Sequence, residues 1–170
     1  HGTSSGIDPL SIIINEPLLL KSNKDLVKVE IPTYNKTGKN VIFLVNTQVA
    51  RNTENLVNKF NTACEEESFK AKLEKNLIQH TNAGINDFLS GNTAGFYKNL
   101  EEIVKFQRQE MSYLIPEKYQ GIVDNGLENS DYFLKICGSG GGGYMIGFTE
   151  KWKETKQKLK DEELEIIYRY

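Results

Sequence analysis

The sequence has few of the residues that build disulfide frameworks and metal sites. Its 170 residues include only two cysteines and two histidines. Cys64 and Cys137 are too few for a disulfide scaffold and lack the spacing of metal ligands, so we expect a reducing, cytoplasmic compartment. With His1 and His80 as the only histidines, we also expect no structural zinc site.

Concentrated charge and long apolar runs are also missing. The chain carries 21 basic and 23 acidic residues, with a net charge of −2 and no long basic block. This argues against nucleic acid or an anionic membrane as a partner. The longest apolar runs, such as Ile12–Ile14 and Leu18–Leu20, fall far short of the roughly 20 residues of a membrane span. We therefore expect one compact domain with a mixed, solvated surface.

Apolar segments bounded by turn residues predict strands near both ends of the chain. The first apolar pair, over 11–21, is interpreted as a hairpin or two bent strands. Further strands are predicted over 26–31, 41–45, 132–137, 144–148 and 164–167. The segment 41–45 is apolar throughout, which indicates a strand covered on both faces.

Helical spacing of apolar residues dominates the middle of the chain. It predicts helices over 56–78 and 85–89, and a long helix over 94–114 that ends before Pro116. Another helix is predicted from an N-cap at Thr149 to Lys160. The order of elements predicts an α+β fold, in which helices pack on one face of a largely antiparallel sheet.

A glycine-rich segment between two predicted strands is the clearest physical signal. Cys137 is followed by Gly138, Ser139, Gly140, Gly141, Gly142 and Gly143. Ordering each glycine costs about 0.5–1 kcal/mol relative to alanine, so the backbone must approach something closely or adopt unusual angles. Successive amides here could form an anion-binding concavity, and a tight inter-strand turn is the structural alternative.

Two further segments carry polar groups that could do chemistry. Asp8 is a carboxylate in a glycine- and serine-rich turn, where a capping role is the alternative. The segment 46–53 (NTQVARNT) joins a buried strand to a helix. Arg51 lies near that helix start, where the helix dipole favours acids, so it is better suited to hold an anion or a carboxylate. A solvated loop is the alternative for this segment.

These three segments together resemble the signatures of the mevalonate kinase family. HGTSSGID, residues 1–8, is similar to the family's HGxxSGxD, and NTQVARNT is similar to NTxVPRxT with Ala50 in place of proline. CGSGGGGY, residues 137–144, resembles TGAGGGGC, with Cys137 and Tyr144 as departures. The resemblance covers essentially the whole chain and places it in the galactokinase, homoserine kinase, mevalonate kinase and phosphomevalonate kinase (GHMP) superfamily.

The resemblance implies a kinase that uses ATP and Mg²⁺. Asp8 would be the catalytic carboxylate, and the glycine loop would lie near the nucleotide phosphates. His1, Ser5, Thr47 and Arg51 would lie on the side of the small-molecule substrate. Diphosphomevalonate decarboxylase shares the architecture, but nothing in the sequence favours it.

The family's ATP-binding phosphate loop has no counterpart in this sequence, and the family's metal-binding serine and glutamate belong to the same missing part. The resemblance therefore implies no metal ligand in this chain. We therefore expect residues 1–24 to be the end of the N-terminal lobe and residues 25–170 to be the C-terminal domain. The missing N-terminal lobe is then a partner, the isolated chain is inactive, and a homodimer stays open. Other substrates also stay open (phosphomevalonate, a sugar or an amino acid), as does a non-catalytic binding module.

Overall fold

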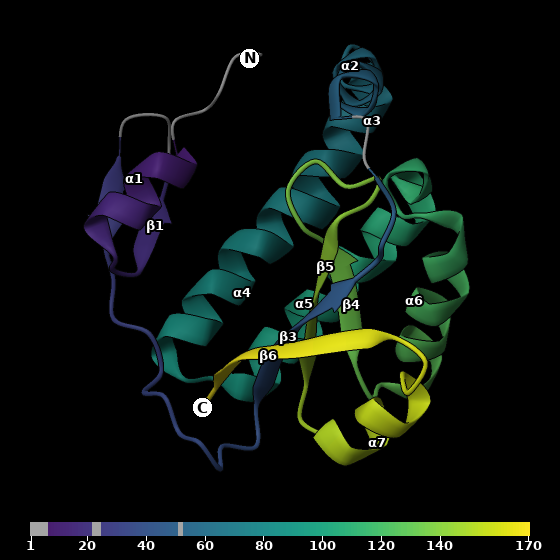
Figure 1. Ribbon diagram of the computed structural model, residues 1–170. Coiled ribbons are helices and arrows are strands. Elements are labelled where there is room, and N and C mark those ends of the chain that lie inside the picture. Colours follow the sequence, from purple (N-terminus) through teal and green to yellow (C-terminus); the bar gives the residue numbers. More distant parts are fainter. Residues whose placement is uncertain (1–6, 22–24, 51–52) are drawn as a thin grey trace.

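The computed structural model describes residues 7–21, 25–50 and 53–170 (Figure 1). The strands are β1 (Leu18–Leu20), β2 (Leu26–Lys28), β3 (Val41–Asn46), β4 (Phe133–Ile136), β5 (Tyr144–Thr149) and β6 (Glu163–Arg169). The α-helices are α1 (Ile7–Ile14), α2 (Thr53–Ala63), α3 (Glu67–Lys72), α4 (Gln79–Ser90), α5 (Thr93–Glu110), α6 (Glu117–Asn129) and α7 (Trp152–Lys158). A π-helical turn, η1 (Leu73–Ile78), joins α3 to α4, and a 3-10 turn, η2 (Ser112–Leu114), follows α5.

A four-stranded sheet forms the centre of the molecule. Its strand order is β4-β5-β3-β6, and each neighbouring pair is antiparallel. A register shift between Ile42 and Phe43 interrupts the β3–β6 pairing. The predicted α+β class with an antiparallel sheet is therefore confirmed.

Strand β3 presents different side chains to the two faces of the sheet, because successive residues of a strand point in opposite directions. Ile42 lines a cavity together with residues of α4 and α5, so these helices cover its face. Phe43 is fully buried on the other face, where its ring centroid lies 5.3 Å from that of Trp152 in α7. In Figure 1, α4 and α6 lie on opposite sides of the sheet. The structure thus adds packing on a second face to the layer of helices expected from the sequence.

Helix α5 supplies much of the hydrophobic core. Asn92 caps its first turn by accepting a hydrogen bond from the Gly95 N–H at 3.2 Å. The apolar stripe predicted from the sequence is buried at Leu100, Ile103 and Val104. The long predicted helix over 94–114 is confirmed as α5 followed by η2.

Two local expectations were wrong in part. Ile12–Ile14 is helical within α1 rather than a strand, although Leu18–Leu20 does form a strand that pairs with β2. Asp and Pro in a first turn favour a helix, and this local preference outweighs the β propensity of three isoleucines. The last helix starts at Trp152 rather than at Thr149, which ends β5.

Helix α6 was not predicted at all. Pro116 was interpreted as the residue after a helix, yet it is also the N-cap of the next one. Proline is tolerated at a helix start, because the first N–H groups of a helix have no intrahelical acceptor. Gly126 of α6 is buried, and a Cβ there would lie 2.6 Å from the Tyr132 carbonyl oxygen, so this glycine permits close packing on the following strand.

Candidate glycine-loop site

The sheet brings two of the three sequence motifs together. Strand β3 runs into NTQVARNT, and β5 starts directly after the glycine loop. Because β3 and β5 are antiparallel, with Asn46 opposite Tyr144, the two motifs meet at one end of the sheet. Thr47 and Gly143 are 96 residues apart in the sequence but in contact here.

Thr47 fastens the two segments to each other. Its N–H and its hydroxyl both donate to the Gly143 carbonyl, at 2.8 and 2.7 Å. The Gly143 N–H donates to the Val49 carbonyl at 2.9 Å, and the Val49 N–H donates to the Thr47 hydroxyl oxygen at 3.3 Å. Since Thr47 is buried and its hydroxyl is engaged twice, it holds the loop in this conformation.

The backbone of the loop requires glycine. All five of its glycines have positive φ, between 63° and 151°. At Gly142 an added Cβ would lie 2.3 Å from the Val49 carbonyl oxygen, closer than any real contact. The entropy lost on ordering these glycines is therefore explained by left-handed angles and by close approach to the 46–50 segment.

The loop is also fixed from its other side. The Gly141 N–H donates to the Leu114 carbonyl at 2.6 Å. Two of the five glycine amides, those of Gly141 and Gly143, thus bind protein carbonyls instead of facing a ligand. The loop is a braced concavity, and any phosphate would be held by the remaining backbone groups.

A pocket of about 560 Å³ opens beside the loop. Its wall is formed by the loop, by α2, and by the segment that leads into α6, and includes Ala50, Leu56, Tyr113, Gln120 and Gly141. Near it, the ammonium of Lys59 lies 4.4 Å from the centre of the Tyr113 ring, a cation–π contact. The pocket places both motif segments around one space large enough for a small molecule.

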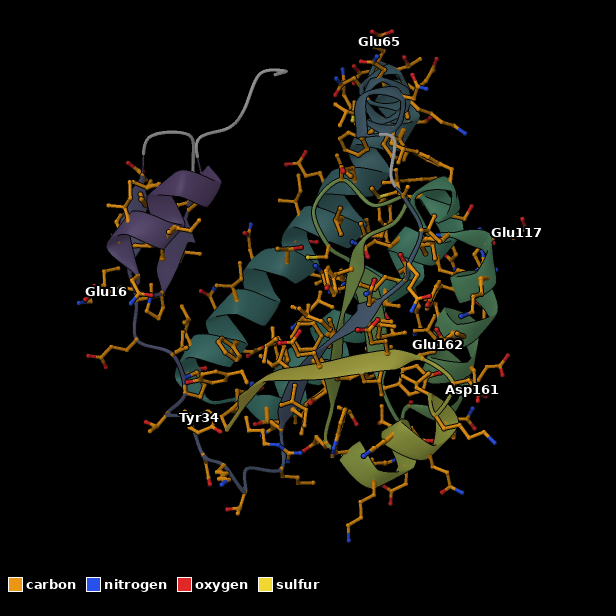
Figure 2. The ribbon with its side chains drawn as sticks, in the orientation of Figure 1. Glu16, Tyr34, Glu65, Glu117, Asp161 and Glu162 are labelled. Carbon is orange, nitrogen blue, oxygen red and sulfur yellow. The ribbon has the colours of Figure 1, made fainter. Side chains whose placement is uncertain are left out.

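A network at the end of β3 supports this arrangement and was not found from the sequence. The Tyr119 hydroxyl lies 2.5 Å from the Glu162 carboxylate and 3.3 Å from the Asn46 carbonyl oxygen. Burial and the hydrogen bond to Glu162 raise the pKa of Tyr119. The side chain of Glu162 is 7% exposed, lies beside α6 in Figure 2, and also accepts from Lys118 at 2.9 Å. Burial alone would raise the pKa of Glu162, but the hydrogen bonds from Tyr119 and Lys118 hold it below its ordinary value.

The remaining predicted site residues are not brought to this site by the described part of the chain. His1, Ser5 and Arg51 lie outside the described residues. Asp8 lies in the first turn of α1, and the description does not extend to its side chain. Figure 1 shows α1 apart from the loop that precedes β5. The catalytic and substrate-binding roles of these four residues stay predictions.

The described residues include neither a cluster of metal ligands nor a helix that could span a membrane. No group of three or more His, Cys, Asp or Glu side chains in these ranges could hold a metal ion. Within the same ranges, no helix is long and apolar enough to cross a membrane.

Comparisons with known proteins identify solved structures with a similar fold. No protein-family model and no curated protein matches the sequence. The crystal structure of L. major mevalonate kinase in complex with R-mevalonate is similar, with a TM-score of 0.71 and 18% identity, over 95% of this chain and 49% of that chain. Streptococcus pneumoniae phosphomevalonate kinase in complex with phosphomevalonate and AMPPNP is similar with a TM-score of 0.64 and 12% identity, over 84% of this chain and 43% of that chain.

The chain thus has a GHMP-kinase-like fold and spans about half the length of the kinases it matches. Both neighbours act on small molecules, as their names state. The mixed helix and antiparallel-sheet architecture expected from the order of elements is confirmed.

Proposed function

We propose that this chain is the C-terminal portion of a mevalonate kinase-like enzyme, which transfers the γ-phosphoryl group of MgATP to a substrate hydroxyl. The observation that carries the proposal is the meeting of NTQVARNT with the glycine loop, through the hydrogen bonds of Thr47 to Gly143. Two segments that resemble motifs of one family lie far apart in the sequence but in contact here, on a fold similar to that of such a kinase.

In this proposal the chain contributes positioning and one acid–base group. The substrate hydroxyl oxygen attacks the γ-phosphorus, the bond to the departing ADP oxygen breaks, and Asp8 accepts the hydroxyl proton. The glycine loop closes over the phosphates, and Thr47 keeps it in place. Arg51 binds an acidic group of the substrate, and His1 and Ser5 lie beside it.

The missing N-terminal lobe is part of the proposal. Helix α1 and strands β1 and β2 expose large apolar side chains, including Ile12 at 77% and Ile13 at 80%. Such a surface is typical of an interface, and we assign it to that lobe. Because β1 pairs with β2 across residue 24, we propose that the lobe boundary lies after Lys28 rather than after residue 24.

Phosphomevalonate is the second candidate substrate. Ala50, Cys137 and Tyr144 depart from the mevalonate kinase signatures, and Ala50 lines the pocket beside the loop. The phosphomevalonate kinase neighbour shares the fold. A cytoplasmic enzyme agrees with the two cysteines, both of which are free thiols.

The test is ADP release by the full-length protein that contains this chain, with MgATP and either mevalonate or phosphomevalonate. The variant Asp8→Asn is expected to lose activity by at least about 100-fold, the typical contribution of a general base. Asp161→Asn, at an exposed position, is the matched control. Turnover unchanged by Asp8→Asn would remove the catalytic role of Asp8. A folded, ATP-binding protein without turnover of either compound would exclude both substrates.

A further inference from the structure

A second cavity lies away from the glycine loop, between the sheet and helices α4 and α5. Its volume is about 350 Å³, within the range of small-ligand pockets, roughly 300–1,000 Å³. The lining is mostly apolar and comes from both layers, with Ile42, Ile146 and Phe148 on the sheet and Ile85, Phe88 and Phe96 on the helices. None of these residues belongs to the site described above.

Lys135 of β4 adds one positive charge to this apolar lining. It pairs with Ile146 of β5 and so shares that residue's face of the sheet. Its ammonium donates to the Ile136 carbonyl at 3.0 Å. Among the described residues, no carboxylate forms an ion pair with it.

The surroundings of Lys135 favour an anion. Burial lowers the pKa of its ammonium below the ordinary value, because the charged form is poorly solvated there. A desolvated charge with a single neutral acceptor is unfavourable, and a bound carboxylate would compensate it. The cavity therefore offers apolar volume and one unbalanced charge in the same place.

We propose that this cavity binds a small amphiphile, with an aliphatic chain in the apolar space and a single carboxylate paired with Lys135. One lysine balances one negative charge. A phosphate monoester, with a charge of about −1.5 to −2 at neutral pH, would leave excess charge among apolar side chains. The ligand would lie beside β4, which ends at Ile136 directly before the glycine loop segment. It would leave the loop itself free.

The proposal is tested by titrating the chain, by calorimetry, with decanoate below its micellar concentration and with decanol. Decanoate is expected to saturate one site and to bind about 10- to 100-fold more tightly than decanol, as a charge-assisted hydrogen bond predicts. Equal affinities, or no saturable binding of decanoate, would overturn the proposal.

Variants locate the site. Lys135→Met keeps an apolar stem and should remove the preference for decanoate while leaving decanol binding unchanged. Lys153→Met, at an exposed position of α7, is the matched control and should bind as the unchanged protein does. Thr81→Phe, which fills the cavity from α4, should abolish binding of both compounds. If Lys153→Met weakens decanoate binding as much as Lys135→Met does, the ligand is held by general surface charge and the proposal is wrong.

Discussion

The N-terminal region (residues 7–28) exposes large apolar side chains, whereas the sheet-centred body (residues 41–169) buries them. Ile12 and Ile13 of α1 are 77% and 80% exposed, whereas Phe43 and Val45 of β3 are fully buried. In Figure 1 the N-terminal elements lie apart from the sheet, with an extended segment between them. Within the part of this region that the structure describes, no residue belongs to the hydrophobic core.

The difference shows that apolar content alone does not say what a segment is packed against. The body buries its apolar residues between its own sheet and helices, so the contacts that stabilise it lie within the body itself. The N-terminal region has two short strands and one helix, too little to bury an apolar face by itself. Its exposed surface indicates a partner, which we have proposed to be the missing lobe.

The largest predicted effect lies in the body. Phe43→Ala should lower the free energy of unfolding by about 3–5 kcal/mol, because a fully buried ring is replaced by a cavity. Ile13→Ala in the N-terminal region should change it by less than about 0.5 kcal/mol, as at other exposed sites. Urea unfolding followed by circular dichroism measures both. Comparable losses would show that the two regions form one cooperative unit.

The glycine loop should be nearly as sensitive. Gly142→Ala forces a left-handed angle and a contact with the Val49 carbonyl, which we expect to cost about 1–3 kcal/mol. Gly121→Ala in α6 is the matched control, because a Cβ there meets no atom within 4 Å. It should stabilise the chain by about 0.5–1 kcal/mol through helix propensity. Thermal unfolding compares the two variants. If Gly142→Ala leaves the stability unchanged, the loop can adopt another conformation that accommodates a side chain at this position.

An acid titration compares ion pairs of the two regions. Hydrogen bonds from Lys151 and Lys158 hold the pKa of Asp131 below its ordinary value. Because the folded pKa is the lower one, this stabilisation is present above the unfolded pKa and is lost as the pH falls through the folded pKa. Asp131→Asn should therefore cost about 0.5–1 kcal/mol at pH 7, and the difference should vanish in acid.

The N-terminal ion pair supplies the control for that titration. Glu16 and Lys28 approach to 2.5 Å but are largely exposed, and they join β2 to the segment before β1. Glu16→Gln should leave the unfolding of the body unchanged at every pH. A pH-dependent loss in this variant would contradict the separation of the two regions.

The smallest effect is expected from removing residues 1–28. The free energy of unfolding of the remaining body should stay within about 0.5 kcal/mol of that of the intact chain, because none of the described residues in this segment belongs to the core. Light scattering should show less self-association, since the exposed apolar surface is removed. A body that fails to fold after this deletion would refute the comparison.

Strong local patterns made much of the fold predictable. The apolar segment 41–45, the stripe of α5 and the β-rich segments beside the glycine loop all form the expected elements. Helix α6 was not predicted because its apolar stripe is sparse, it contains two glycines, and it follows a proline. The opposite error was made at Ile12–Ile14, where three β-branched residues were interpreted as a strand and the preference of Asp8 and Pro9 for a helix start was not considered.

By itself the sequence determined the glycine loop, since only glycine adopts these five backbone angles without strain. Tertiary structure alone decided that Thr47 holds Gly143, that Tyr119 and Glu162 support the end of β3, and that Lys135 faces an apolar cavity. The physical reason is the distance along the sequence between the residues that interact. Angles and helical stripes are properties of neighbouring residues, whereas these contacts depend on strand register and on packing between segments tens of residues apart.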